Sequence, residues 1–124
     1  MSTIKQIIER VDANKPNAFS TETKMAWLSA LEGKIAADVL LMNITEIRQL
    51  EYRYPGDLES EPLVTFPHED IYDLWLMAKI DFENGEYSKY QNSMALYNSA
   101  FNNFVCWFAS VYDPAQGYRR EGWG

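Results

Sequence analysis

The sequence contains one cysteine, Cys106, and one histidine, His68, in 124 residues. A single cysteine excludes an intrachain disulfide and a zinc site built from several thiolates. Apolar residues occupy the two positions on each side of Cys106, and this setting predicts a buried, unreactive thiol. Such cysteine usage is typical of a protein that works in a reducing compartment.

The sequence also lacks the motifs of nucleophilic and phosphate chemistry, since it contains no glycine-rich phosphate loop and no G-x-S-x-G elbow. His68, Glu69 and Asp70 are possible metal ligands, but three consecutive side chains splay around a helix start, where they favour capping. Asp73 and Asp81 lie eight residues apart, which is typical of acids on a solvated helical face rather than of an acid–base pair. We therefore predict no enzyme activity, no catalytic residues, no metal and no cofactor.

Basic residues are scarce, because 11 lysines and arginines stand against 18 acids and give a formal net charge of −7. Residues 57–86 hold nine acids and the single base Lys79. Such a segment repels phosphate backbones, so direct binding of DNA or RNA is disfavoured. An acidic surface could instead line a passage through which DNA slides without sticking, and its candidates are Asp57, Glu59 and Glu61. The alternative is a solvated acidic face that aids solubility.

No apolar run approaches the roughly 18 residues of a membrane span. The first twelve residues are charged and amphipathic, unlike a secretory signal. Together with the lone cysteine, these features predict a cytosolic protein with no membrane partner.

What the sequence does contain is the composition of a folded chain, with 47% hydrophobic and 15% aromatic residues. Its length fits one core, so we predict a single helical domain over 1–113 and a flexible C-terminal arm over 114–124. Apolar residues recur at helical spacing over about 3–13 and 21–42, and again in the last third of the chain. The prediction is a mainly α protein, a small bundle of about four helices.

The C-terminal half predicts an antiparallel helical hairpin, with helices at 69–83 and 86–112 joined at Asn84-Gly85. Glycine readily takes the left-handed conformation that ends a helix, and so short a link makes the two helices neighbours. The large residues of the second helix step by three and four positions, which is typical of a helix packed lengthwise on a partner. They are Tyr87, Tyr90, Met94, Tyr97, Phe101, Phe104, Phe108 and Val111.

Residues 43–66 lose helical periodicity and contain a strong turn signal at Tyr54-Pro55-Gly56-Asp57. We expect an ordered loop or a small β-hairpin here. The competing interpretation extends the second helix through 44–52. Gly33, inside that second helix, costs about 1 kcal/mol relative to alanine and therefore predicts a close packing partner.

The tail contains Tyr118, Arg119, Arg120 and Trp123 among glycines, outside any periodic helix. Tyrosine, tryptophan and arginine are the residue types enriched at interface hot spots. We predict an arm that docks on a neighbouring subunit or a partner, with a frayed terminus as the alternative.

Three segments of the hairpin resemble small proteins encoded in the structural-gene clusters of tailed phages and prophages of Gram-positive bacteria. These segments are residues 66–81, the link Asn84-Gly85-Glu86-Tyr87 and the run from Tyr90 to Ala95. The family is that of the head–tail connector proteins, also called adaptor or head-completion proteins. The block from Asn17 to Ala36 is similar to the same family, so the resemblance covers about 17–112 apart from the central loop.

The resemblance implies a non-enzymatic structural protein that joins a ring of like subunits beneath the portal after the capsid has filled with DNA. It implies the portal and tail-completion proteins as partners, and DNA that passes by without specific binding. It also implies a location in the host cytoplasm during assembly and then in the virion. The alternative is a helical protein-binding module of phage origin that captures a partner peptide or a regulatory protein. A third option is an enzyme whose site is shared between subunits.

Overall fold

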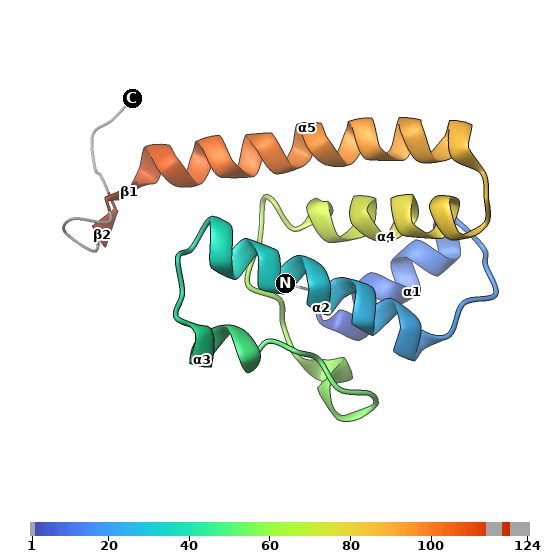
Figure 1. Ribbon diagram of the computed structural model, residues 1–124, viewed down its shortest axis with the longest axis horizontal. Helices are drawn as coiled ribbons and strands as arrows, with labels where there is room; N and C mark the ends of the chain where they lie inside the picture. The colour runs from blue at the N-terminus through green and yellow to red at the C-terminus, as the bar shows by residue number, and fades with distance from the viewer. Residues whose placement is uncertain (1, 114–117, 120–124) are drawn as a thin grey trace.

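The computed structural model describes residues 2–113 and 118–119, and over them the protein is mainly helical, as the sequence predicts (Figure 1). The elements, in chain order, are α1 (Ile4–Asn14), α2 (Thr21–Asp38), α3 (Ile44–Arg48), the 3-10 turn η1 (Gly56–Glu59), α4 (Asp70–Glu83), α5 (Tyr87–Val111), β1 (Tyr112–Asp113) and β2 (Tyr118–Arg119). The two short strands pair with each other in antiparallel register.

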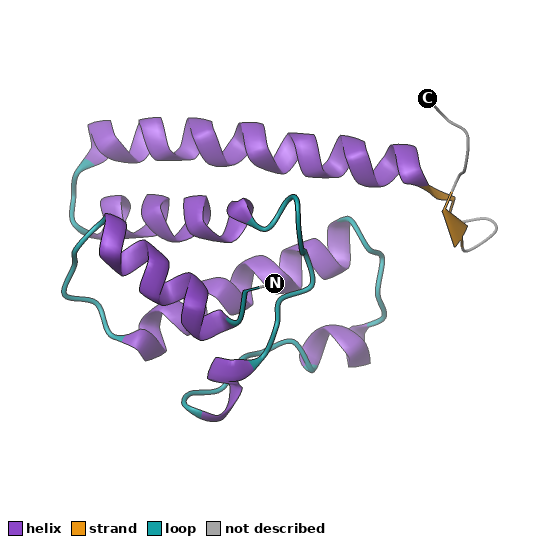
Figure 2. Ribbon diagram, turned by 180° about the vertical axis from the view of Figure 1, so that it is seen from behind, coloured by secondary structure: helices purple, strands orange, loops and turns teal. Residues whose placement is uncertain are grey.

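Helix α4 lies at the centre of the molecule. The long helix α5 runs along one side of it, whereas α1 and α2 pack on the other side, and α3 and η1 form the far edge (Figures 1 and 2). The side chains of Ile71, Tyr72, Leu76 and Ile80 are completely buried, because neighbouring helices cover α4 on both sides. The core is therefore organised around α4.

Helix α1 begins with a complete capping box, in which Thr3 and Gln6 each bind the other's backbone N–H. Ile4, Ile7 and Val11 are fully buried, as their helical spacing predicts. The helix ends at Asn14, two residues before Pro16, which disfavours helix in the residue that precedes it.

Helix α2 begins after Ser20, a residue type that is favoured at N-caps, and the Ser20 hydroxyl accepts a hydrogen bond from the Thr23 N–H. It ends at Asp38, however, and the predicted end near residue 42 is wrong. Leu41 takes a φ of +54°, and the Met42 N–H donates to the Ala36 carbonyl at 2.9 Å. This turn closes the helix with a left-handed residue that is not glycine, so the usual sequence signal is missing.

The segment 43–66 contains no strand, so the predicted β-hairpin is wrong, and the loop interpretation describes it better. A continuous extension of α2 is also wrong. Asn43 caps a separate helix, α3, because its side chain accepts from the Glu46 N–H while Glu46 accepts from the Asn43 N–H. The turn signal at Tyr54-Pro55 leads into η1.

At the end of α4 the chain reverses through Gly85, which has a φ of +74°. The long seam of α5 then faces α4, with Tyr97 and Phe104 buried and the Tyr97 ring 5.2 Å from the Trp75 ring. Tyr87, at the start of the seam, is 60% exposed. The aromatic contacts run along the whole seam, since the Phe82 ring of α4 also lies 5.1 Å from the Tyr90 ring near the start of α5.

Ion pairs tie α1 and the residue after it to α4, and they correct the expectation that Asp73 and Asp81 lie on a solvated face. Asp73 accepts two hydrogen bonds from Arg10, at 2.6 and 2.7 Å. Asp81 is only 1% exposed and accepts from the Lys15 ammonium at 2.7 Å. Both carboxylates are structural, since a buried charge without its partner would be strongly destabilising.

Gly33 does not have the close packing partner that the sequence predicts, because a Cβ added there would meet nothing within 4 Å. We expect Gly33→Ala to raise the free energy of unfolding by about 1 kcal/mol, since alanine is the better helix former. Urea denaturation would measure the change. Gly85→Ala is the matched control, and it should destabilise because Gly85 has a positive φ. A destabilised Gly33→Ala variant would contradict the open space at this position.

Candidate functional site

A buried carboxylate holds the loop 49–68 against the helical core. Glu32, on α2, has no exposed surface. Its Oε2 atom accepts from the Tyr52 hydroxyl at 2.5 Å and from the Leu63 N–H at 2.9 Å, and its Oε1 atom accepts from the Tyr72 hydroxyl at 2.5 Å. The Val64 N–H in turn donates to the Tyr72 hydroxyl at 2.9 Å. Glu32 therefore connects α2, both ends of the loop and α4.

The two tyrosines of this network are perturbed by their surroundings. Burial raises the pKa of Tyr72, and the negative charge of Glu32 raises it further. The pKa of Tyr52 is raised for the same two reasons in the same order. Both hydroxyls thus remain protonated as donors to the carboxylate well above neutral pH.

Sequence reasoning missed Glu32, although one signal pointed to it. Glu32 lies four residues after Leu28 and three before Ile35, so it falls on the apolar face of α2. An acid on a face that is otherwise buried needs donors, but the sequence does not say where they come from. Here they come from residues 20 to 40 positions away in the chain.

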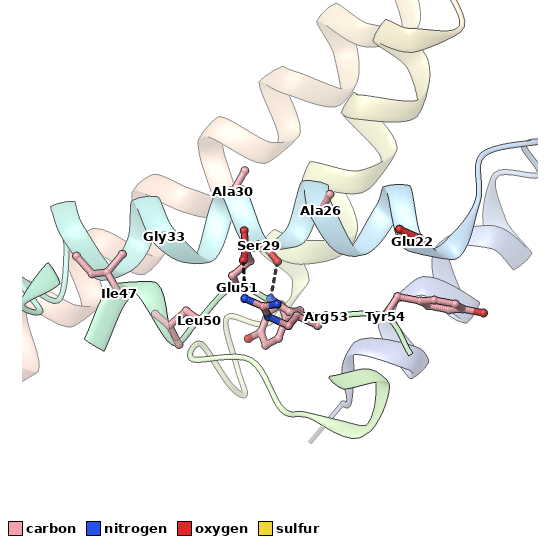
Figure 3. A pocket seen from close by; sticks show the side chains of 11 residues that line it. Glu22, Ala26, Ser29, Ala30, Gly33, Ile47, Leu50, Glu51, Arg53 and Tyr54 are labelled. Carbon is pink, nitrogen blue, oxygen red and sulfur yellow. Dashed lines mark hydrogen bonds and ion pairs between the residues drawn. The ribbon is translucent and has the colours of Figure 1, made fainter. Parts of the chain in front are cut away.

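A groove lies between α2 and residues 47–54, with a volume of about 720 Å³ (Figure 3). The side contributed by α2 carries the small residues Ala26, Ala30 and Gly33, together with Ser29 and the acidic Glu22. The opposite side carries Ile47 and Leu50, together with residues 51–54. The Tyr52 N–H donates to the Ser29 hydroxyl at 2.9 Å and so ties the two walls together. The groove is therefore an open trough with both small and acidic side chains along its α2 side.

A second hollow, of about 290 Å³, lies at the C-terminal end of α5. Apolar and aromatic side chains dominate its lining, among them Leu63, Phe104 and Trp107. Phe66, at its edge, is 81% exposed. An exposed aromatic beside an apolar hollow is typical of a protein-docking surface.

The predicted acidic surface is divided by the structure. Glu59 and Glu61 are exposed, whereas Asp57 is partly buried and accepts a hydrogen bond from the Arg53 N–H at 2.7 Å. Asp57 thus fixes the turn that leads into η1, in addition to any role at the surface.

The predicted arm lies largely outside the described residues. Tyr118 and Arg119 form β2, which pairs with Tyr112–Asp113 directly after α5. Arg120 and Trp123 are outside the part of the chain that the structure describes. The backbone pairing brings β2 back beside the end of α5.

The groups with the greatest chemical reactivity do not gather into a site within the described ranges. No cluster of three or more His, Cys, Asp or Glu side chains there could hold a metal ion. His68 packs against aromatic rings, 5.0 Å from Trp107 and 5.8 Å from Phe104. Cys106 is exposed, so the prediction of a buried thiol is wrong, because the residue points away from the seam of α5.

Removing the Tyr72 hydroxyl should cost about 2–3 kcal/mol of stability, since Tyr72→Phe leaves the Val64 N–H unpaired and removes a donor from a buried charge. Tyr52→Phe should cost less, about 1–2 kcal/mol, because Glu32 Oε2 keeps its bond to Leu63. Urea denaturation measures both values. Tyr87→Phe, at an exposed tyrosine, is the control and should change stability by less than about 0.5 kcal/mol. Equal costs for all three variants would contradict a network centred on Glu32.

Stability should also fall at high pH. A tyrosine of the unfolded chain ionises near pH ~10, whereas the pKa of Tyr72 in the folded protein is raised above this value. The stabilisation is therefore complete below about pH 10 and is lost as the pH rises toward the folded-state pKa. We expect the free energy of unfolding, measured between about pH 9 and 12, to decline more steeply in the wild type than in Tyr72→Phe. Identical slopes would show that the buried hydroxyl does not titrate with unfolding.

Comparison of the chain with protein-family models, with curated proteins and with solved structures found no match. Among the described helices, none combines the length and the apolar character needed to cross a membrane.

Proposed function

We propose that this protein is a head–tail connector subunit of a tailed phage or prophage. In this role it is a non-enzymatic structural protein that joins a ring of like subunits beneath the portal and contributes to the surface on which the tail docks. The observation that carries the proposal is the resemblance of the hairpin segments, residues 66–81 and 84–95, to connector proteins.

The contacts within the hairpin support this proposal, because the resembling segments meet in space. Asp81, at the end of the first segment, accepts from the Ser93 hydroxyl of the last segment at 2.7 Å. The Glu86 N–H of the link donates to the Asp81 carbonyl at 2.9 Å. Lys15, which directly follows α1, forms an ion pair with the Asp81 carboxylate. A hairpin tied together in this way is a rigid scaffold, as a ring-forming subunit requires.

The charge distribution is compatible with the passage of DNA. Glu59 and Glu61 are exposed near η1, and the net charge of the chain is −7. An acidic wall repels the phosphate backbone, so DNA could pass it without binding. In the proposal, Asp57, Glu59 and Glu61 contribute to such a wall.

One observation favours the second candidate function, a helical module that captures a partner peptide. The apolar hollow at the end of α5, with Phe66 and Trp107 beside it, has the character of a groove for an apolar side chain. Such a module binds its partner one to one, whereas a connector subunit assembles into a ring.

Co-expression with the portal protein of the same gene cluster separates these two functions. We expect the protein to purify with the portal as an added ring in negative-stain images. Deletion of 114–124 should abolish portal binding or self-association while leaving the far-UV circular dichroism and the Tm unchanged, because the helical core ends before these residues. A one-to-one complex without a ring would contradict the connector function. A deletion variant that keeps both activities would contradict the docking arm.

A double variant without the likeliest reactive groups tests the non-enzymatic character. His68→Gln combined with Cys106→Ser should support the assembly of infectious particles at the wild-type level. A large loss of assembly by the folded double variant would point to chemistry at these residues.

A further inference from the structure

The groove between α2 and residues 47–54 carries acids as well as apolar side chains. Glu22 lies at one end of the groove and Ile47 at the other (Figure 3). Glu51 and Leu50 belong to the wall that faces α2. A segment that fits this lining must therefore bring positive charge together with an apolar or aromatic side chain.

The carboxylates of the groove are accessible to a partner. Glu22 is exposed and takes part in no ion pair or side-chain hydrogen bond among the described residues. Glu51 pairs with Arg53 at 3.6 Å, and both side chains are more than two-thirds exposed. An ion pair as exposed as this one contributes little, so Glu51 can share its charge with another cation. Arg53 is the only base that lines the groove, which leaves room for further positive charge.

The C-terminal arm has the matching chemistry. Its residues 118–124 contain Arg119 and Arg120 against the single acid Glu121, in a chain whose net charge is −7. The same residues include the aromatic ring of Trp123. Arginine binds carboxylates through two parallel N–H donors, and both arginine and tryptophan are enriched among the residues that dominate interface energetics. The arm therefore supplies what the lining of the groove calls for.

The apolar hollow at the end of α5 is a poorer fit for the arm. None of the residues that line this hollow is charged. Two arginines brought there would lose water without gaining a carboxylate, and an unpaired charge is costly to desolvate. The acids therefore favour the groove over the hollow as the docking site of the arm.

The arm cannot reach Glu22 of its own copy. Leu40 and Val111 line the same hollow, so α5 ends beside the C-terminal end of α2. Strand β2 lies near this point, because it pairs with β1 directly after α5. Glu22, however, lies 16 residues before Asp38, the last residue of α2, which is about 24 Å along the helix. Residues 120–123 span at most about 14 Å, so the cations that meet Glu22 come from a second copy.

We propose that the arm of one copy docks in the α2 groove of the next copy, with its two arginines on Glu22 and Glu51 and Trp123 against the apolar part of the wall. Arm and groove are different surfaces, so the contact is head-to-tail and repeats from copy to copy. It rests on the proposed function, because it gives the arm of a connector subunit its docking site. In a closed ring every copy gives one arm and receives another, so contacts that are individually small reinforce each other.

A disulfide between arm and groove tests the contact in the full-length protein. Cys106→Ser removes the native thiol, Gly122→Cys marks the arm and Ala26→Cys marks the groove. Oxidation at millimolar protein should give this variant a ladder of dimers, trimers and higher species, and peptide mapping should find the two introduced thiols linked. Asn14→Cys in place of Ala26→Cys, at an exposed site outside the groove, is the matched control and should give no ladder. A cross-linked monomer, no cross-link at all, or an equal ladder in the control would overturn the proposal.

Charge reversal with rescue supplies a second measurement in the same thiol-marked protein. Glu22→Lys combined with Glu51→Lys should lower the ladder yield about tenfold or more, because the arginines of the arm then face positive charge. Adding Arg119→Glu and Arg120→Glu to that chain should restore the yield to within about twofold, because opposite charges meet again. A yield that the groove variant leaves unchanged, or that the four substitutions together do not restore, would contradict the contact.

Glu9→Lys combined with Glu83→Lys is the matched control for charge. Both sites are exposed and lie outside the groove, and the net charge changes by the same amount as in the groove variant. A smaller net charge weakens the general repulsion between copies, so this control should keep the ladder yield or raise it. Far-UV circular dichroism checks that every variant is folded. Equal losses in the control and in the groove variant would overturn the proposal.

These results are distinguishable from a failure of the connector function, because neither measurement involves the portal. A ladder formed by a protein that builds no portal ring would retain the contact and remove the function. Portal rings formed equally by the wild type and by Glu22→Lys/Glu51→Lys would retain the function and remove the contact.

Discussion

The buried carboxylate of Glu32 joins parts of the chain that are far apart in sequence. Tyr52 and Leu63 bring both ends of the long loop to it, and Tyr72 brings the central helix α4. Because a buried charge without donors is strongly destabilising, the loop cannot leave the core without a large cost in free energy. The groove wall formed by residues 47–54 is consequently held in place by an interaction beneath it. A surface that has to recognise a partner gains from such support, since less order must be imposed on binding.

Acids of α4 also connect separate segments at the helical hairpin, where they bind Arg10 and Lys15. Lys15 and Ser93 both bind Asp81, so α1, α4 and α5 meet at one buried acid. Arg10 binds Asp73, which lies about two helical turns before Asp81 on α4. Neither pair is strong evidence for high stability, because desolvation offsets much of the attraction. Each pair does fix the register of α1 along α4.

The sequence predicts the parts of this fold that depend on local signals. Gly85 and the spacing of the aromatic residues locate the hairpin, and Ser20 locates the start of α2. The sequence does not predict where α2 ends, because Leu41 takes the left-handed conformation that is usually signalled by a glycine. The sequence does not predict the buried carboxylate of Glu32, and it places Asp81 on a solvated face although Asp81 is buried. In both cases the burial of the charge depends on donors that distant segments supply. Cys106 is exposed rather than buried, because the buried Phe104 near it in sequence lies on the opposite side of the helix.

The two sides of α5 differ in a way that folding alone does not explain. The inner side needs its apolar seam to pack on α4, and this need accounts for Tyr97 and Phe104. The outer side needs only to be soluble, and lysine or glutamate would meet this need with better helix propensity than asparagine or serine. Gly33 presents the same question on α2, because alanine would fit there and would favour the helix. Residues that are suboptimal for the isolated fold are expected where function constrains a surface.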